Sequence, residues 1–105
     1  MPTLYVTAPP AAAEELATSL VEERLAACVN RVPCSSTYRW EGAVEAADEE
    51  ILFVKTTDGG HRAAVEFVEA EHPHDVPCIE TFEEASVLDA YAEWVAASVA
   101  TPDGD

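Results

Sequence analysis

The stretch that most constrains the fold is an unbroken apolar run, Ile51-Leu52-Phe53-Val54. Acidic residues precede it at 48–50, and Lys55-Thr56-Thr57 ends it. A strand with one face in water alternates apolar and polar residues, and this run does not alternate. We therefore predict a strand that is buried on both faces. In a chain of 105 residues, helices can cover one face, and we expect another copy of the same chain to cover the other.

The other elements are predicted from hydrophobic period and turn residues. The predicted strands are 3–7, 29–40, 44–57 and 77–83, and the predicted helices are about 11–27, 61–71 and 86–98. The order β-α-β-β-α-β with a C-terminal helix is typical of the ferredoxin-like split βαβ fold. This α+β fold has both crossover helices on one face of an antiparallel sheet. We expect one domain over residues 1–100 and an acidic, flexible tail at 101–105.

Three local signals refine the ends of these elements. Pro33 cannot donate a hydrogen bond to a sheet, so we expect a bulge or a sheet edge at that position. Asp58 precedes a Gly-Gly turn and is a candidate cap for the second helix. Ser86 with Asp89 is a candidate capping box for the third helix.

Helices on one face of the sheet leave its other face without cover. We expect this second face to be apolar, because it would carry residues from the set Tyr38, Trp40, Ile51 and Phe53. A patch of that size on a soluble protein is normally hidden in an interface. Because homo-oligomers usually have closed symmetry, we predict such an oligomer, although this argument does not give the number of copies.

The charge is strongly one-sided. The chain has 21 Asp and Glu residues against 5 Lys and Arg residues, a formal net charge of −16, and its single lysine is Lys55. Nucleic acids and anionic membranes bind cationic surfaces, so we exclude both as partners. We predict a salt-adapted, halophilic protein, because salt screens such self-repulsion. The alternative is an acid-rich surface that serves solubility alone.

The sequence also predicts a compartment. No apolar run approaches the roughly 20 residues that a membrane helix needs. Residues 1–10 lack the basic and long apolar regions of a signal peptide. Cys28, Cys34 and Cys78 are an odd number of cysteines, which disfavours a disulfide framework and indicates reduced thiols. We therefore expect a cytoplasmic protein.

Candidate metal ligands gather before the last strand. His72, His74 and Cys78 lie within seven residues, and Cys34 could approach from another strand. Imidazole suits copper and zinc, and thiolate suits Cu(I) and zinc. The spacing matches no standard zinc signature. In the alternative interpretation, His72 ends a helix and Cys78 packs as a small hydrophobic residue.

Lys55 is unusual because it lies at the end of the most buried strand of a chain with no other lysine. It would form an ion pair with Glu50 or Asp58, since a buried cation needs a partner. Alternatively, it would bind an anionic ligand in a cleft between subunits. The candidates for that cleft are Tyr38, Arg39, Trp40 and Lys55. We recognise no nucleophile elbow, no phosphate-binding glycine loop and no catalytic carboxylate pair, so we predict no enzyme.

Several blocks, taken together, carry a family resemblance. They are Glu23–Asn30 (ERLAACVN), Tyr38–Gly42 (YRWEG), Glu50–Thr56, His72–Pro77 (HPHDVP) and a helix that bears Trp94. They cover nearly the whole chain, which resembles the CutA family of divalent-cation tolerance proteins. The resemblance implies a ferredoxin-like subunit in a compact cytosolic homotrimer, similar to PII signalling proteins and associated with tolerance to copper and other divalent metals. The family usually has Tyr at His74, Glu at Cys78 and Gly at Cys34, so this chain gains soft or borderline metal ligands.

These observations lead to one functional prediction and one alternative. We predict a cytoplasmic homotrimer that binds a divalent metal, with Cu(II) the foremost candidate and no obligatory cofactor. The alternative is a PII-like regulatory module that binds a small anionic ligand or a partner protein in the clefts between subunits.

Overall fold

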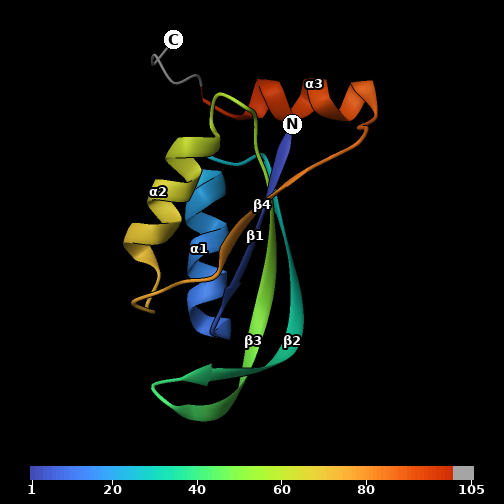
Figure 1. Ribbon diagram of the computed structural model, residues 1–105. Coiled ribbons are helices and arrows are strands. Elements are labelled where there is room, and N and C mark those ends of the chain that lie inside the picture. The colour runs from blue at the N-terminus through green and yellow to red at the C-terminus, as the bar shows by residue number, and fades with distance from the viewer. Residues whose placement is uncertain (101–105) are drawn as a thin grey trace.

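The computed structural model describes residues 1–100, which form a four-stranded antiparallel sheet and three helices (Figure 1). The elements are β1 Pro2–Ala8, α1 Pro10–Glu22, β2 Cys28–Trp40, β3 Ala43–Lys55, α2 His61–Glu71, β4 Ile79–Glu83 and α3 Asp89–Ser98. This order confirms the predicted ferredoxin-like split βαβ arrangement with an added C-terminal helix. None of the helices in these residues is both long and apolar enough to cross a membrane. The predicted tail at 101–105 lies outside the described residues.

The sheet has the strand order β2-β3-β1-β4, and every neighbouring pair is antiparallel. β2 is therefore an edge strand, which agrees with the edge predicted at Pro33. α1 and α2 lie side by side on one face of the sheet, and α3 lies across the end of the sheet near the N-terminus (Figure 1). The helices therefore cover the two faces of the sheet very unequally.

The core lies between α1, α2 and one face of the sheet. Directly paired strand residues carry their side chains on the same face. The pairs Leu4–Val54 and Val6–Leu52 place four fully buried side chains against the helices. Burial of one such side chain stabilises the fold by about 1.5–3 kcal/mol. The helices contribute Ala13, Leu16, Leu20, Ala64 and Val68 to this core.

α1 is shorter than predicted. It ends at Glu22 rather than near Ala27, because Arg24 adopts the left-handed conformation with a φ of 59°. The N–H of Leu25 then donates to the carbonyl of Leu20 at 2.9 Å, which satisfies a carbonyl of the last helical turn. The chain leaves the helix at this turn and enters β2.

α3 is held at its C-terminal end. It has no side-chain hydrogen bond at its first turn, so the predicted capping box of Ser86 and Asp89 is wrong. At the other end, the guanidinium of Arg24 donates to the carbonyls of Ala97 and Ser98 at 3.1 and 3.2 Å. These carbonyls have no partner within the helix, and a cation there suits the helix dipole. Arg24 therefore joins the end of α1 to the end of α3.

The predicted cap of α2 is also wrong. Asp58 is exposed, and its carboxylate lies 3.7 Å from the N-terminal amine of Met1. The N–H of Gly60 instead donates to Oγ1 of Thr57 at 2.9 Å. Because Asp58 points away from the helix, a hydroxyl one residue earlier satisfies the backbone at the start of α2.

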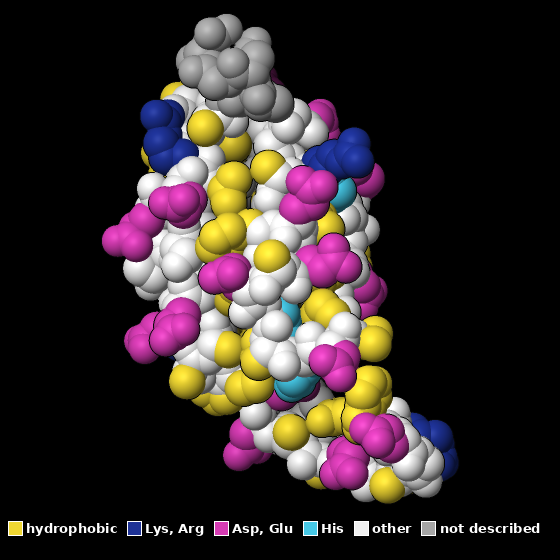
Figure 2. Space-filling view, turned by 90° about the vertical axis from the view of Figure 1, so that its left-hand side faces the viewer, with side chains coloured by type: hydrophobic (Ala, Val, Ile, Leu, Met, Phe, Trp, Pro, Cys, Tyr) yellow, Lys and Arg dark blue, Asp and Glu magenta, His cyan; other side chains and the backbone are white. Residues whose placement is uncertain are grey.

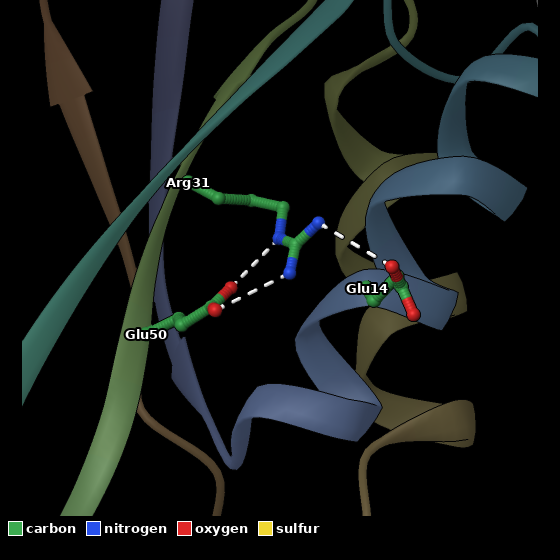
Figure 3. A network of polar contacts seen from close by, with 3 residues as sticks. All are labelled: Glu14, Arg31 and Glu50. Atoms are coloured by element: carbon green, nitrogen blue, oxygen red, sulfur yellow. Dashed lines mark hydrogen bonds and ion pairs between the residues drawn. The ribbon is translucent and has the colours of Figure 1, made fainter.

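β2 and β3 form a long hairpin that extends beyond the helices (Figure 1). Arg31 joins this hairpin to α1, since its guanidinium donates to Glu50 at 2.7 and 3.2 Å and lies 4.0 Å from Glu14 (Figure 3). The hydrogen bonds to Glu50 raise the pKa of Arg31 above its ordinary value. The hairpin closes at Glu41 and Gly42, which have φ values of 50° and 81°. Beyond Arg31 the hairpin has solvent on both sides over most of its length.

Acidic side chains are scattered over the helix-bearing face, and basic side chains occupy few positions there (Figure 2). Few of the carboxylates have a cationic partner within the described residues. The ion pairs of residues 1–100 are Arg31 with Glu14 and Glu50, Arg62 with Glu66, and the N-terminus with Asp58. Repulsion among the remaining carboxylates is the physical basis of the predicted salt adaptation, which stays a prediction.

Added KCl should stabilise this chain. Raising the concentration from about 0.1 M to about 1 M shortens the Debye length from about 10 Å to about 3 Å. We expect Tm, measured by circular dichroism, to rise over this range, because repulsion among carboxylates weakens. A variant with Glu15, Glu69 and Glu93 each changed to Gln should show a smaller rise. A Tm that falls or stays constant in the wild type would contradict salt adaptation.

Candidate functional site

The face of the sheet opposite α1 and α2 is called the open face below. The strand register assigns to it the odd-numbered residues of β1 and β3 and the even-numbered residues of β2 and β4. Ile51 and Phe53 lie on it and are partly exposed, whereas Leu52 and Val54 are fully buried on the helix side. We predicted that this strand is buried on both faces. Within one chain, it is fully buried on the helix side and only partly buried on the open face.

The open face contains a groove where the hairpin leaves the rest of the sheet. The hairpin forms one wall, the segment 73–78 between α2 and β4 forms another, and β1 lies between them. The groove has a volume of about 640 Å³. It is lined by Tyr5, Thr7, Ser36, Tyr38, Trp40, Glu49, Pro73, His74, Asp75, Val76, Cys78 and Glu80.

Tyr5 forms a fixed aromatic surface in the groove. Its ring meets Phe53 edge-on with 5.8 Å between centroids and stacks on Phe82 at 5.5 Å. Such pairs stabilise both ring positions. Burial raises the pKa of Tyr5 most, and the Cys78 thiol and nearby carboxylates raise it further. The phenol therefore stays protonated at neutral pH and can donate or accept a hydrogen bond.

His72 fixes the segment that forms the second wall. Its Nε2 lies 2.8 Å from the carbonyl oxygen of Thr7, and its Nδ1 accepts the N–H of His74 at 3.0 Å. These two bonds require Nε2 to carry the proton and Nδ1 to be free of one. The imidazole of His72 is buried and acts as a bridge between β1 and the backbone of the wall.

The groove is acidic. Three carboxylates line it, those of Glu49, Asp75 and Glu80, and its lining includes no Lys or Arg. The Glu49 side chain is only 7% exposed. Its oxygens are not among the buried side-chain atoms of residues 1–100 that lack a hydrogen-bond partner. The electrostatic character of the groove therefore favours a cation.

Comparison with known proteins places the chain in a family. The family described as CutA1 divalent ion tolerance protein matches residues 3–98. The chain belongs to the CutA1 family. The divalent-cation tolerance protein CutA of Thermus thermophilus is 45% identical over 84 residues, which are 79% of this chain and 82% of that protein. The chloroplastic protein CutA of Arabidopsis thaliana is 43% identical over 94 residues, which are 88% of this chain and 52% of that protein. The chain thus spans about half, or less, of the plant relatives that it matches.

Solved CutA1 structures share the fold. The divalent cation tolerance protein of Thermus thermophilus superposes with a TM-score of 0.87 at 40% identity, over 94% of this chain and 99% of that one. The structure described as the periplasmic divalent cation tolerance protein CutA of Archaeoglobus fulgidus gives 0.88 at 36% identity, over 93% and 98%. These comparisons confirm the predicted ferredoxin-like fold. The names describe tolerance proteins and mention no catalytic activity.

The single CutA1 chain does not bring its four predicted metal ligands together. Cys34 and Cys78 lie toward opposite edges of the sheet, with β3 and β1 between them. His72 has both ring nitrogens engaged by the backbone. His74 and Cys78 do share the groove. Within residues 1–100, no three His, Cys, Asp or Glu side chains are placed to hold one metal ion.

The predicted ligand cleft is likewise divided within one chain. Tyr38 and Trp40 line the groove, but Arg39 lies on the other face of the same strand. Lys55 lies ten residues along β3 from Glu45, the partner of Tyr38. At about 3.3 Å per residue this places Lys55 roughly 33 Å from the aromatic pair. One chain therefore offers no anion site made of these four residues.

The predicted ion pair of Lys55 does not form. Glu50 is engaged by Arg31, and Asp58 is paired with the N-terminal amine. The register explains the first result, because Lys55 lies on the open face and Glu50 on the helix side. Among residues 1–100, Lys55 has no ion-pair partner.

Sequence reasoning missed most of the groove. It did not single out Tyr5, Asp75 or Glu80, because these residues come together only through the pairing of β1 with β4 and the path of segment 73–78. Glu49 did leave a signal. It precedes Ile51 by two residues, so it lies on the same face of the strand as Ile51 and Phe53.

The reactivity of Cys78 should show the influence of its acidic neighbour. Burial has the largest effect on the pKa of this thiol and raises it, whereas hydrogen bonds with Thr7 lower it. Glu80 raises the pKa as well, and its Oε2 lies 3.5 Å from the Sγ of Cys78. In a variant with Ser at the other two cysteine positions, alkylation by iodoacetamide should have its pH midpoint above the usual value of about 8.5. Glu80→Gln should lower that midpoint because a thiolate no longer forms beside a carboxylate.

Glu83→Gln is the matched control for this experiment, because Glu83 lies on the same strand but on its other face. It should leave the alkylation profile unchanged. Equal midpoints for wild-type and Glu80→Gln proteins would show that Glu80 does not influence the thiol.

Proposed function

We propose that this CutA1 family member supports tolerance to divalent cations as a cytoplasmic homotrimer, and that its acidic groove receives the metal. The observation that carries the proposal is the donor set of the groove. Imidazole, thiol and carboxylate groups line one cavity whose lining includes no Lys or Arg. Copper is the preferred metal, because Cu(II) has the highest affinity of the divalent first-row ions for such ligands.

Cys78 and Glu80 lie close together, with 3.5 Å between Sγ and Oε2. His74 lines the same groove and, unlike His72, keeps its imidazole free of the two backbone bonds that occupy His72. The chemistry of these three groups fits copper or zinc. Because one chain does not bring three donors together, metal binding would require movement of His74 or a donor from a neighbouring copy.

The homotrimer is proposed from the open face. Val32, Tyr38, Trp40 and Phe82 are on this face and are 41–46% exposed. β2 and β4 are also edge strands, whose backbone groups can pair with another chain. An apolar face with unpaired edges favours association of copies. The number of copies in the oligomer, three, is proposed from the resemblance to the family.

The second candidate is a PII-like module that binds a small anionic ligand or a partner protein between subunits. Lys55 favours it, because this cation lies on the open face and has no ion-pair partner among residues 1–100. The groove itself does not favour an anion, because it holds carboxylates and no cationic side chain. We therefore place metal binding first. The cytoplasm remains the proposed compartment because the three cysteines are free thiols.

Isothermal titration with Cu(II) and Zn(II) tests the metal proposal. The double variant His74→Ala with Cys78→Ser should bind at least about tenfold more weakly than the wild type, a loss of about 1.4 kcal/mol. His61→Ala is the control, because this histidine is hydrogen-bonded to Thr81 and does not line the groove. Equal affinities for the wild type and the double variant would exclude the groove as the metal site.

A further inference from the structure

We propose that the groove of each copy receives the side chain of Arg39 from the hairpin of a neighbouring copy, and that Asp75 is the carboxylate that binds it. The contact rests on the proposed homotrimer and specifies how one copy touches the next. Three features carry it: the exposed end of the hairpin, the scarcity of basic residues, and the acidic, aromatic lining of the groove.

The end of the hairpin lacks cover on both faces. Every residue from 38 to 46 is exposed, and this end projects past α1 and α2 (Figure 1). Trp40 lies on the open face and Val44 on the other face, and they are 42% and 66% exposed. An isolated two-stranded hairpin is only marginally stable in water. Because both faces of this end carry large apolar side chains, we expect a neighbouring copy to cover it.

Few basic residues are available for a contact between copies. The chain has five Lys and Arg residues in all. The guanidinium of Arg24 is bound to carbonyls of α3, and Arg31 and Arg62 form ion pairs within the chain. Arg39 and Lys55 have no ion-pair partner among residues 1–100. Of these two, Arg39 lies on the projecting end of the hairpin, whereas Lys55 lies at the opposite end of β3.

The lining of the groove suits a guanidinium group. Tyr38 and Trp40 contribute aromatic rings, and the lining includes carboxylates but no Lys or Arg. A guanidinium stacks on aromatic faces and binds a carboxylate through two parallel hydrogen bonds. The groove also belongs to the open face, which the homotrimer would cover. A basic side chain of a neighbouring copy is therefore the occupant that this surface fits.

Asp75 is the carboxylate of the groove that best fits this role. Glu49 is only 7% exposed, and Glu80 accepts a hydrogen bond from the thiol of Cys78. Asp75 is exposed and has no ion-pair partner among residues 1–100. It lies on the segment that His72 fixes to β1, so its backbone position is set before association. The contact uses none of the donors of the metal proposal.

The two sides of the contact are different patches of the chain. Arg39 lies on the face of the sheet that carries the helices, whereas the groove is on the open face. A contact between two different patches repeats from each copy to the next and closes into a ring when the rotation permits. Each copy of a cyclic homotrimer would thus give one arginine and receive one.

Charge reversal in the full chain tests the contact. Light scattering coupled to gel filtration measures the mass over a range of protein concentrations at one fixed KCl concentration. Arg39→Asp and Asp75→Arg should each raise the concentration at which half of the trimers dissociate by at least about tenfold, since each places like charges together. Each should also lower Tm, because association stabilises the folded chain. Arg39→Lys should have a smaller effect, since lysine keeps the charge but not the planar fork.

The double variant Arg39→Asp with Asp75→Arg restores opposite charges across the contact, so it should recover most of the lost association and of the lost Tm. The single variants also separate a specific pair from general repulsion. Asp75→Arg makes an acidic chain less negative, so repulsion alone predicts stronger association, whereas the proposed pair predicts weaker association. Arg62→Asp is the charge-matched control for Arg39→Asp, because Arg62 is an exposed residue of α2 outside the groove. It should leave association unchanged.

The possible failures are distinguishable. A wild-type protein that stays monomeric would overturn the contact together with the homotrimer. A trimer whose mass and Tm neither reversal changes would overturn the contact and leave the homotrimer standing. Weakening in both single variants without recovery in the double variant would show that the two side chains do not meet. Equal weakening in Arg39→Asp and Arg62→Asp would show diffuse repulsion instead of an ion pair.

Discussion

The structure depends on one constraint: α1 and α2 cover a single face of the sheet. This one-sided cover gives alternate residues of the same strand different environments, so Leu52 is fully buried while Phe53 beside it is partly exposed. The helix side provides the apolar burial that stabilises the chain. The open face carries the groove, the partly exposed aromatic residues and, by register, Cys28 and Cys34. The apolar core and the groove thus lie on opposite faces of the same strands.

The groove exists because the hairpin is longer than the helices that support it. Arg31 joins the hairpin to α1, and beyond that point no helix covers either face of β2 and β3. Segment 73–78 lies opposite the hairpin and is fixed by the two backbone bonds of His72. A histidine that looked like a metal ligand therefore serves to shape the site. Its neighbour His74, two residues along, is the one that lines the cavity.

Much of the fold could be predicted from the period of the apolar residues, because strands and helices repeat at different spacings. The order of elements followed from that pattern, and the edge at Pro33 agrees with a proline's lack of a backbone N–H. The end of α1 did not follow from it, because the left-handed conformation of Arg24 that ends this helix leaves no signal in the spacing of apolar residues. The site was harder to predict, because residues that lie close together in sequence, such as His72, His74 and Cys78, do not meet around one point in the structure of residues 1–100. For Glu49, the only signal in the sequence was its position in the alternation of the strand.

The central claim is that the open face is completed by further copies of this chain, and its most direct test is the molar mass in solution. Light scattering coupled to gel filtration, in high salt and without added metal, should give about three times the chain mass of 11.3 kDa. That result would mean that the partly exposed residues of β2 and β4 are covered by association. A mass of one chain at micromolar concentration would contradict the account, because the open face would then be stable in water without a partner.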